Sequence, residues 1–159
     1  IFLVENGENL GISPNQIFLF GQSAGASHVA SYLFDKKFNH KNISNISGSI
    51  LFSGAYDLSI MKSDAVAKYY GEDESLYPKM SSINFVSEEC CPLFVVTSEF
   101  DPPVFKLQSE RLIQKLIENE HKPSHKNLSN HNHLSQVIHL NTDDKSIGPD
   151  LIDFINKNK

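Results

Sequence analysis

The sequence predicts an α/β fold in which crossover helices cover a mostly parallel sheet. Short apolar runs of the kind found in buried strands alternate with segments of helical spacing, and this alternation is typical of a parallel sheet. The third run is rich in branched and aromatic residues and stops before Pro102 and Pro103. The runs expected as buried strands are residues 17–20, 48–54 and 92–97.

Three helices are expected around these strands in the first part of the chain. Residues 1–10 have the pattern of the end of a helix, and Gly11 should stop it because glycine readily adopts the left-handed conformation found at helix C-termini. Residues 24–34 continue from the first strand as a helix, and residues 62–70 form another that ends at Gly71.

The second half of the chain is expected to complete the sheet. Residues 105–117 carry leucine and isoleucine at helical spacing with charges between them, which predicts an amphipathic helix packed on the sheet. The remaining expectations are an irregular acidic and aromatic cover over one end of the sheet at 72–86, a polar loop at 119–132, a last strand at 134–140 and a closing helix at 147–155.

The composition is that of one soluble globular domain, residues 1–159. The chain is 40% hydrophobic and 21% charged, and a net charge of −5 with scattered lysines and arginines argues against nucleic-acid binding. No apolar run approaches the roughly 18 residues of a membrane span. The adjacent pair Cys90 and Cys91 implies no disulfide framework, which slightly favours the cytoplasm while the localisation stays open.

The first strand runs into Gly21-Gln22-Ser23-Ala24-Gly25, a G-x-S-x-G pattern followed by a helix. A sharp strand-to-helix turn exposes the serine hydroxyl and brings the neighbouring backbone segments close together. The positions two before and two after the serine are therefore expected to have no room for a side chain, and both are glycine. The helix that starts near Ala24 directs free N–H groups and the positive end of its dipole at the space over Ser23. This context predicts Ser23 as a nucleophile and the Ala24 amide as an oxyanion donor.

Two aspartates compete for the role of the acid that orients a catalytic histidine. In an open parallel sheet the loops at the carboxyl ends of the strands meet in one crevice. Asp101 follows the third expected strand and Asp57 follows the second, so each lies where such an acid is required. Asp101 is preferred because the strand before it is the stronger one, and Glu99 is a weaker third candidate.

The base is expected among seven histidines, most of which lie in a helix, a turn, a loop or a strand. His131 and His133 remain, because they come just before the last expected element, where a side chain can reach over Ser23. The cluster of His121, His125, His131 and His133 also suggests a metal site. It lacks the tight Cys or His pairs of known zinc motifs, so neither a metal nor a cofactor is expected.

With Gly21–Ala26, Ser98–Pro103 and His131–Ser135 in this order, the chain resembles the α/β-hydrolase fold esterases. More narrowly, it resembles the carboxylesterase and hormone-sensitive-lipase-like group, which grades into enzymes that deacylate small esters. The resemblance covers essentially the whole chain, including residues 53–58. It implies Ser23 as nucleophile, Asp101 as acid and His133 as base. The family's histidine segment usually reads Gly-His-Asn-His, and Asn130 stands here in place of the glycine.

Enzymes of this group also carry an HGG-type loop well upstream of the serine, which supplies further oxyanion N–H groups. No such motif occurs in these 159 residues, and the chain begins with Ile1 in what looks like a helix. We therefore expect the C-terminal part of a single α/β-hydrolase domain, a partial fold whose N-terminal strands are missing and which is nearly inactive alone.

The leading functional hypothesis is a serine hydrolase that cleaves a small carboxylic ester through an acyl-enzyme intermediate. A serine peptidase or amidase on the same fold is the first alternative, because a triad does not fix the leaving group. A non-catalytic fragment or interaction protein is the second. The sequence leaves the oligomeric state and the acyl and alcohol groups open.

Overall fold

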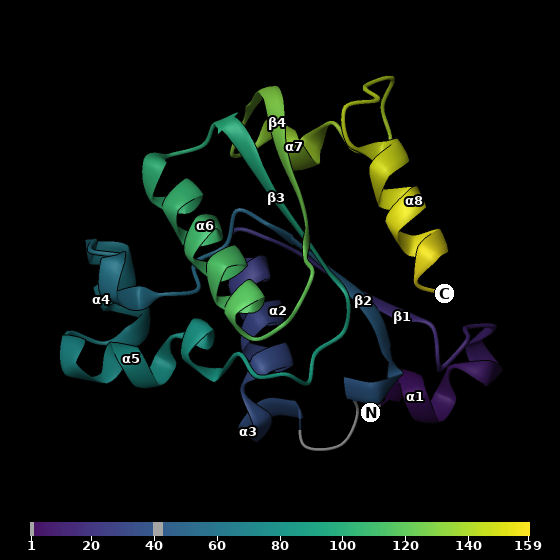
Figure 1. Ribbon diagram of the computed structural model, residues 1–159, viewed down its shortest axis with the longest axis horizontal. Helices are drawn as coiled ribbons and strands as arrows, with labels where there is room; N and C mark the ends of the chain where they lie inside the picture. Colours follow the sequence, from purple (N-terminus) through teal and green to yellow (C-terminus); the bar gives the residue numbers. More distant parts are fainter. Residues whose placement is uncertain (1, 40–42) are drawn as a thin grey trace.

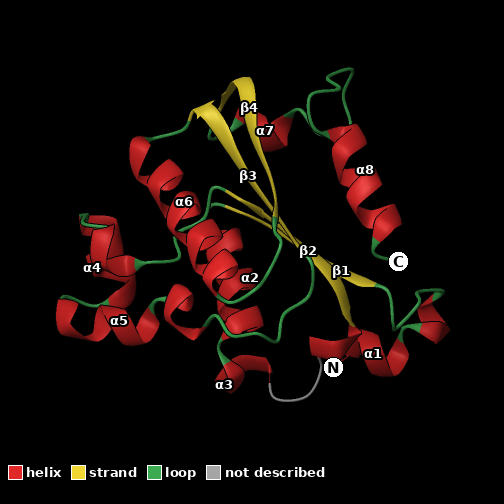
Figure 2. Ribbon diagram, in the orientation of Figure 1, coloured by secondary structure: helices red, strands yellow, loops and turns green. Residues whose placement is uncertain are grey.

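A computed structural model describes residues 2–39 and 43–159. Within these residues the sheet has four parallel strands in the order β1-β2-β3-β4 (Figure 1, Figure 2). Because all strands run the same way, their carboxyl ends lie along one edge of the sheet. The strands are β1 Ile17–Gln22, β2 Ile46–Phe52, β3 Leu93–Phe100 and β4 Ser124–Asn132.

Helices cover both faces of the sheet. α2 and α6 lie on one face and α8 lies on the other (Figure 1). No helix in the described part of the chain is both long and apolar enough to cross a membrane. The α-helices are α1 Phe2–Asn6, α2 Ala24–Phe34, α3 Lys36–Asn39, α4 Asp64–Tyr70, α5 Tyr77–Met80, α6 Pro103–Glu118, α7 Ser135–Ile138 and α8 Gly148–Lys157, and the short 3-10 helices are η1 Glu8–Leu10, η2 Ile43–Asn45, η3 Leu58–Ile60, η4 Glu74–Leu76 and η5 Ser82–Phe85.

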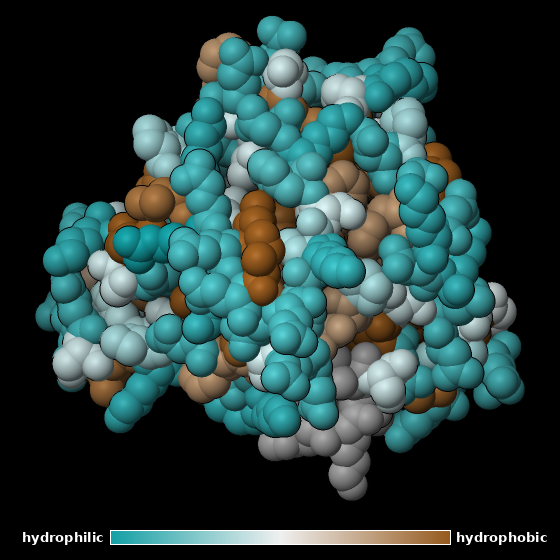
Figure 3. All heavy atoms as spheres, viewed as in Figure 1, coloured by the Kyte–Doolittle hydropathy of each residue, from teal (hydrophilic) through white to brown (hydrophobic). Residues whose placement is uncertain are grey.

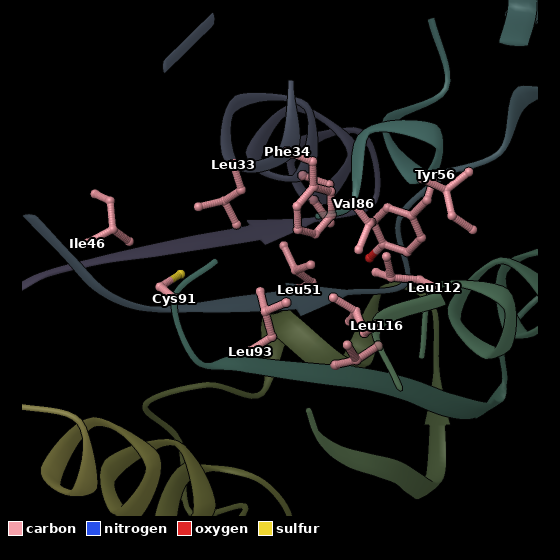
Figure 4. Close-up of a cluster of buried hydrophobic side chains, with 14 residues drawn as sticks. Leu33, Phe34, Ile46, Leu51, Tyr56, Val86, Cys91, Leu93, Leu112 and Leu116 are labelled. Carbon is pink, nitrogen blue, oxygen red and sulfur yellow. The ribbon is translucent and has the colours of Figure 1, made fainter. Parts of the chain in front are cut away.

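Alternate residues of the central strands face two separate hydrophobic cores. On one face Leu51 of β2 is fully buried among side chains of α2 and α6, including Leu112 (Figure 4). On the opposite face Phe52 of β2 and Phe94 of β3 pack with Phe154 of α8. Each fully buried side chain of this size stabilises the fold by roughly 2 kcal/mol relative to an exposed one. This burial on both faces explains why neighbouring residues are all apolar at 50–52 of β2 and at 93–96 of β3.

The prediction for the end of the chain is wrong for two segments. Residues 124–132, expected as part of a loop, form β4, so His125 lies in a strand. β4 pairs with β3 and is an edge of the described sheet. Leu128 and His131 are its buried residues, and the others are largely polar and at least partly exposed. An edge strand of this composition lacks the apolar alternation by which strands are recognised.

The segment expected as the last strand, residues 134–140, contains the short helix α7 instead. Its apolar residues Leu134, Val137 and Ile138 recur at helical spacing, which favours a helix over a strand. His139, expected inside a strand, follows the helix directly.

Two further segments differ from expectation. The N-terminal helix ends at Asn6 and is followed by η1, after which Gly11 adopts the left-handed conformation as predicted, with φ 70°; Ile1 lies outside the described residues. The stretch 72–86, expected to be irregular, contains η4, α5 and η5.

The turn between β1 and α2 requires a glycine at one of its two expected positions. A Cβ atom added at Gly21 would lie 2.4 Å from the carbonyl oxygen of Gly25, so a side chain there collides with backbone. A Cβ atom added at Gly25 meets nothing within 4 Å. The expectation that the turn excludes side chains at both positions is therefore wrong for Gly25. Gly21 packs against the backbone of Gly25, but a side chain at Gly25 itself would point into free space.

We predict that Gly21→Ala lowers the free energy of unfolding by about 2 kcal/mol or more, because either the strand or the helix must shift to relieve the overlap. Gly25→Ala is the matched control and should leave stability unchanged or slightly raised, since alanine favours a helix. Urea denaturation of both variants beside the parent protein measures the difference. Equal stability of the two variants would contradict this account of the turn.

Candidate active site

Ser23 lies between β1 and α2 in a backbone conformation that non-glycine residues rarely adopt. Its φ is 55° and its ψ is −120°. Its N–H donates to the carbonyl of Phe52 at 2.8 Å, and its own carbonyl accepts from the N–H of Ser27 at 3.1 Å. These bonds to β2 and to the first turn of α2 hold the strained residue in place.

His133 lies between Ser23 and Asp101. Its Nε2 is 2.8 Å from Oγ of Ser23, and its Nδ1 is 2.8 Å from Oδ1 of Asp101. The ring of Phe105, near the start of α6, stacks on the imidazole with a centroid distance of 4.4 Å and an interplanar angle of 22°. The three residues come from the ends of β1, β3 and β4, so the parallel sheet brings them to one edge.

The backbone around His133 is held by side-chain amides. The carbonyl of His133 accepts from the amide of Gln22 at 2.8 Å and from the amide of Gln136 at 2.9 Å. Just before it, Oδ1 of Asn132 accepts from the N–H groups of Leu134 and Ser135 at 3.0 Å and 2.9 Å. The imidazole is thus positioned by a polar turn that leads into α7.

Asn130 occupies the place where the resembled family has glycine, and it adopts a φ of 62°. Asparagine tolerates this left-handed region better than other residues with side chains. Its N–H donates to Oε2 of Glu99 at 2.8 Å. The departure from the family pattern therefore keeps the backbone conformation, and Glu99, the third acid considered from the sequence, binds backbone there.

The carboxylate of Asp101 is completely buried and contacts a donor at each oxygen. Oδ2 lies 2.6 Å from Oγ of Ser53 and accepts from the N–H of Ser98 at 2.7 Å, while Oδ1 faces His133. Oε1 of Gln136 is 3.1 Å from the hydroxyls of both serines.

Sequence reasoning missed this shell around Asp101. Ser53 and Ser98 interrupt or end apolar strand runs, and a polar residue in a buried run signals a polar partner. Gln136 gave no signal, because its segment was assigned to a strand.

The two alternates lie in other environments. Asp57 accepts from Ser59 and pairs with Arg111 at 2.5 Å. Burial alone would raise the pKa of Asp57, but the hydrogen bonds from Ser59 and Arg111 outweigh it and lower the pKa below its usual value. His131 is buried, with Nε2 3.0 Å from Oγ of Ser146, so it faces away from Ser23. The structure thus brings Ser23, His133 and Asp101 together and keeps Asp57 and His131 apart from them.

A cleft of about 720 Å³ opens beside Ser23. Most of its lining is apolar and comes from the segments around η3, α4 and the start of α6, and hydrophobic side chains gather between α4 and the start of α6 in the space-filling view (Figure 3). Ala24 also lines the cleft, and as the first residue of α2 its N–H has no acceptor within the helix. The cleft accommodates an apolar group next to the serine hydroxyl and a backbone donor.

Known proteins similar to this chain include a kynurenine formamidase and several esterases. The formamidase, from Danio rerio, is 30% identical over 130 residues, which are 78% of this chain and 44% of the relative. A truncated carbohydrate esterase from gut microbiota superposes with a TM-score of 0.78 at 16% identity, covering 99% of this chain and 64% of that one. The carboxylesterase Cest-2923 of Lactobacillus plantarum gives 0.74 at 16% identity, with 98% and 63% covered.

This chain therefore spans less than half the length of the curated relative and less than two thirds of these structures. The structural matches show the α/β-hydrolase fold, as the sequence predicted. The BD-FAE family model matches residues 1–116. The chain belongs to the BD-FAE family of α/β-hydrolase-like proteins.

Proposed function

We propose that this chain carries the catalytic residues of a serine hydrolase that cleaves a carboxylic ester through an acyl-enzyme intermediate. The observation that carries the proposal is the hydrogen-bonded series Ser23–His133–Asp101, with 2.8 Å at each step, at the edge of an apolar cleft. Both distances lie within the range over which a proton is transferred between a nucleophile and its base.

In the acylation step Oγ of Ser23 attacks the carbonyl carbon of the ester, and its proton moves to Nε2 of His133. The imidazolium then gives this proton to the departing alkoxide, so an alcohol leaves and the acyl group stays on Ser23. In deacylation a water molecule attacks the acyl carbon, loses its proton to Nε2 and releases the acid as the proton returns to Ser23. Atoms and charge balance over the two steps.

Asp101 acts on the base and not on the substrate. A buried carboxylate accepts hydrogen bonds, so it selects the tautomer of His133 with the proton on Nδ1 and leaves Nε2 free to accept from Ser23. It also stabilises the imidazolium that forms in each step. The N–H of Ala24, at the positive end of α2, is the oxyanion donor that this chain supplies.

A formamide is the second candidate substrate, because the Danio rerio relative is a formamidase by name. The same attack by Ser23 would release an amine in place of an alcohol, with His133 as the proton donor. Two further alternatives are a hydrolase that acts on peptide amides and a protein that keeps the fold without catalysis. The experiments below separate them.

Replacing Ser23 with Ala should lower turnover of a short-chain nitrophenyl ester by roughly a million-fold, because no nucleophile remains. The parent protein should react with a fluorophosphonate probe and the variant should not. Ser129→Ala, which changes an exposed serine of β4, is the control and should retain both properties. Undiminished hydrolysis or labelling of the Ser23 variant would end the proposal.

Replacing Asp101 with Asn should cut turnover by about ten-thousand-fold, because an amide favours the wrong tautomer of His133. Asp57→Asn is the matched control. It removes the charge that pairs with Arg111 and should reduce thermal stability slightly while turnover stays within a few-fold. A larger loss of turnover in the Asp57 variant would reverse the assignment of the acid.

Esters and formamides should be distinguished by direct competition. We expect the protein to hydrolyse short-chain nitrophenyl esters faster than formanilides, since a nitrophenolate leaves more readily than an anilide, and to leave peptide amides intact. Measured kcat/KM values for the three substrate classes check this. Faster hydrolysis of the formanilide would overturn the ester assignment and leave the role of Ser23 standing.

A further inference from the structure

Three side chains of metal-binding type meet near the candidate base but outside its cleft. His131 lies near the end of β4, His139 directly follows α7, and Asp144 lies in the loop before α8. Oδ2 of Asp144 is 3.2 Å from Nε2 of His131 and 3.0 Å from Nδ1 of His139. All three ligand atoms lie within 4.8 Å of one another.

We propose that this cluster binds one zinc ion. Zinc takes imidazole nitrogen and carboxylate oxygen at about 2.0–2.2 Å with tetrahedral geometry, which places neighbouring ligand atoms about 3.3–3.6 Å apart. The two distances to Asp144 are already close to this spacing. The rings of His131 and His139 lie edge to face with their centroids 5.2 Å apart, and the 50% exposed side chain of His139 has room to shift toward this spacing.

The chemistry of the ligands selects the type of ion. Two imidazoles and one carboxylate suit zinc, whereas calcium and magnesium prefer sites made of oxygen. Three protein ligands leave the fourth position for a water molecule or for the hydroxyl of Ser146, which is 3.0 Å from Nε2 of His131.

The surrounding contacts orient the ligands as metal sites require. Nδ1 of His131 lies 3.3 Å from Oγ of Ser135, so a proton on Nδ1 can be donated outward while Nε2 presents its lone pair to the ion. Oδ1 of Asp144 accepts from the N–H of Ser146 at 2.8 Å, which leaves Oδ2 facing the histidines. His131 is buried, so its ring is fixed by packing.

The loop that carries Asp144 holds charges of both signs. Asp143 and Asp144 are acidic, and the ammonium of Lys145 donates to the carbonyl of Thr142 in the same loop. The ammonium of Lys126 donates a hydrogen bond to the carbonyl of Ser146 in the same loop, and its charge is balanced by the carboxylate of Asp150.

An ion at this cluster would link β4, α7 and the loop before α8. His133 lies within the linked segment, two residues after His131, so the ion braces the segment that holds the candidate base. None of the three ligands lines the cleft beside Ser23, which makes the ion a structural brace and not a group that touches substrate.

The test uses the full-length protein, freed of metal with a chelator and titrated with Zn²⁺ alone by calorimetry. We expect an ion bound at this site and a rise of several degrees in the melting temperature, because a ligand that binds the folded state stabilises it. Asp144→Asn and His139→Ala should each weaken Zn²⁺ binding by more than about a hundredfold, since loss of outer contacts alone costs ten- to a hundredfold, and should abolish the rise. Mg²⁺ should produce neither effect.

Two control variants match these changes. Asp143→Asn removes the exposed neighbouring carboxylate, and His125→Ala removes an exposed histidine of β4, so both should bind Zn²⁺ like the parent. Ser23→Ala should also bind normally, which keeps the result independent of the proposed hydrolysis. Unchanged affinity and an unchanged thermal rise in Asp144→Asn and His139→Ala, or no thermal response of the parent to Zn²⁺, would overturn the proposal.

Discussion

The backbone contact between β1 and α2 is the constraint on which the candidate site depends. Because Gly21 has no side chain, the carbonyl of Gly25 fits into the space that a Cβ atom at Gly21 would fill. This close packing closes the turn around Ser23. The strained conformation of Ser23 costs about 1–3 kcal/mol, which its bonds to β2 and α2 offset. The same closure points the hydroxyl toward His133 and sets the N–H of Ala24 beside the cleft, so the candidate nucleophile and the candidate oxyanion donor are positioned by one contact.

The buried carboxylate of Asp101 is the second element that the surrounding structure must accommodate. Taking an ion out of water costs several kcal/mol unless hydrogen bonds replace the lost hydration. Ser53 from the end of β2, Ser98 from β3 and His133 from the turn before α7 supply these contacts. Asp101 therefore ties three parts of the chain together beside the imidazole of His133, whereas Asp57 pairs with Arg111 away from it.

The parts of this arrangement that were predictable from the sequence are those with a strong local signal. The strand before Ser23 and the helix after it have distinct periodicities, and β2 and β3 are recognisable because they are buried on both faces. β4 was missed because an edge strand that buries little more than Leu128 shows no apolar alternation. The open side-chain position at Gly25 and the grouping of His139 with Asp144 depend on three-dimensional packing, which no spacing in the sequence encodes.

The turn after β4 explains how two histidines only two residues apart reach different environments. In a regular strand such residues would face the same side. Asn130 with its positive φ and the end of β4 at Asn132 break this regularity, so His131 turns inward to α7 and its following loop while His133 turns toward Ser23. His133 is positioned by amide contacts at its backbone and by Phe105 on one ring face. Its side chain consequently stays 19% exposed, which gives the imidazole access to the water that the proposed deacylation step consumes.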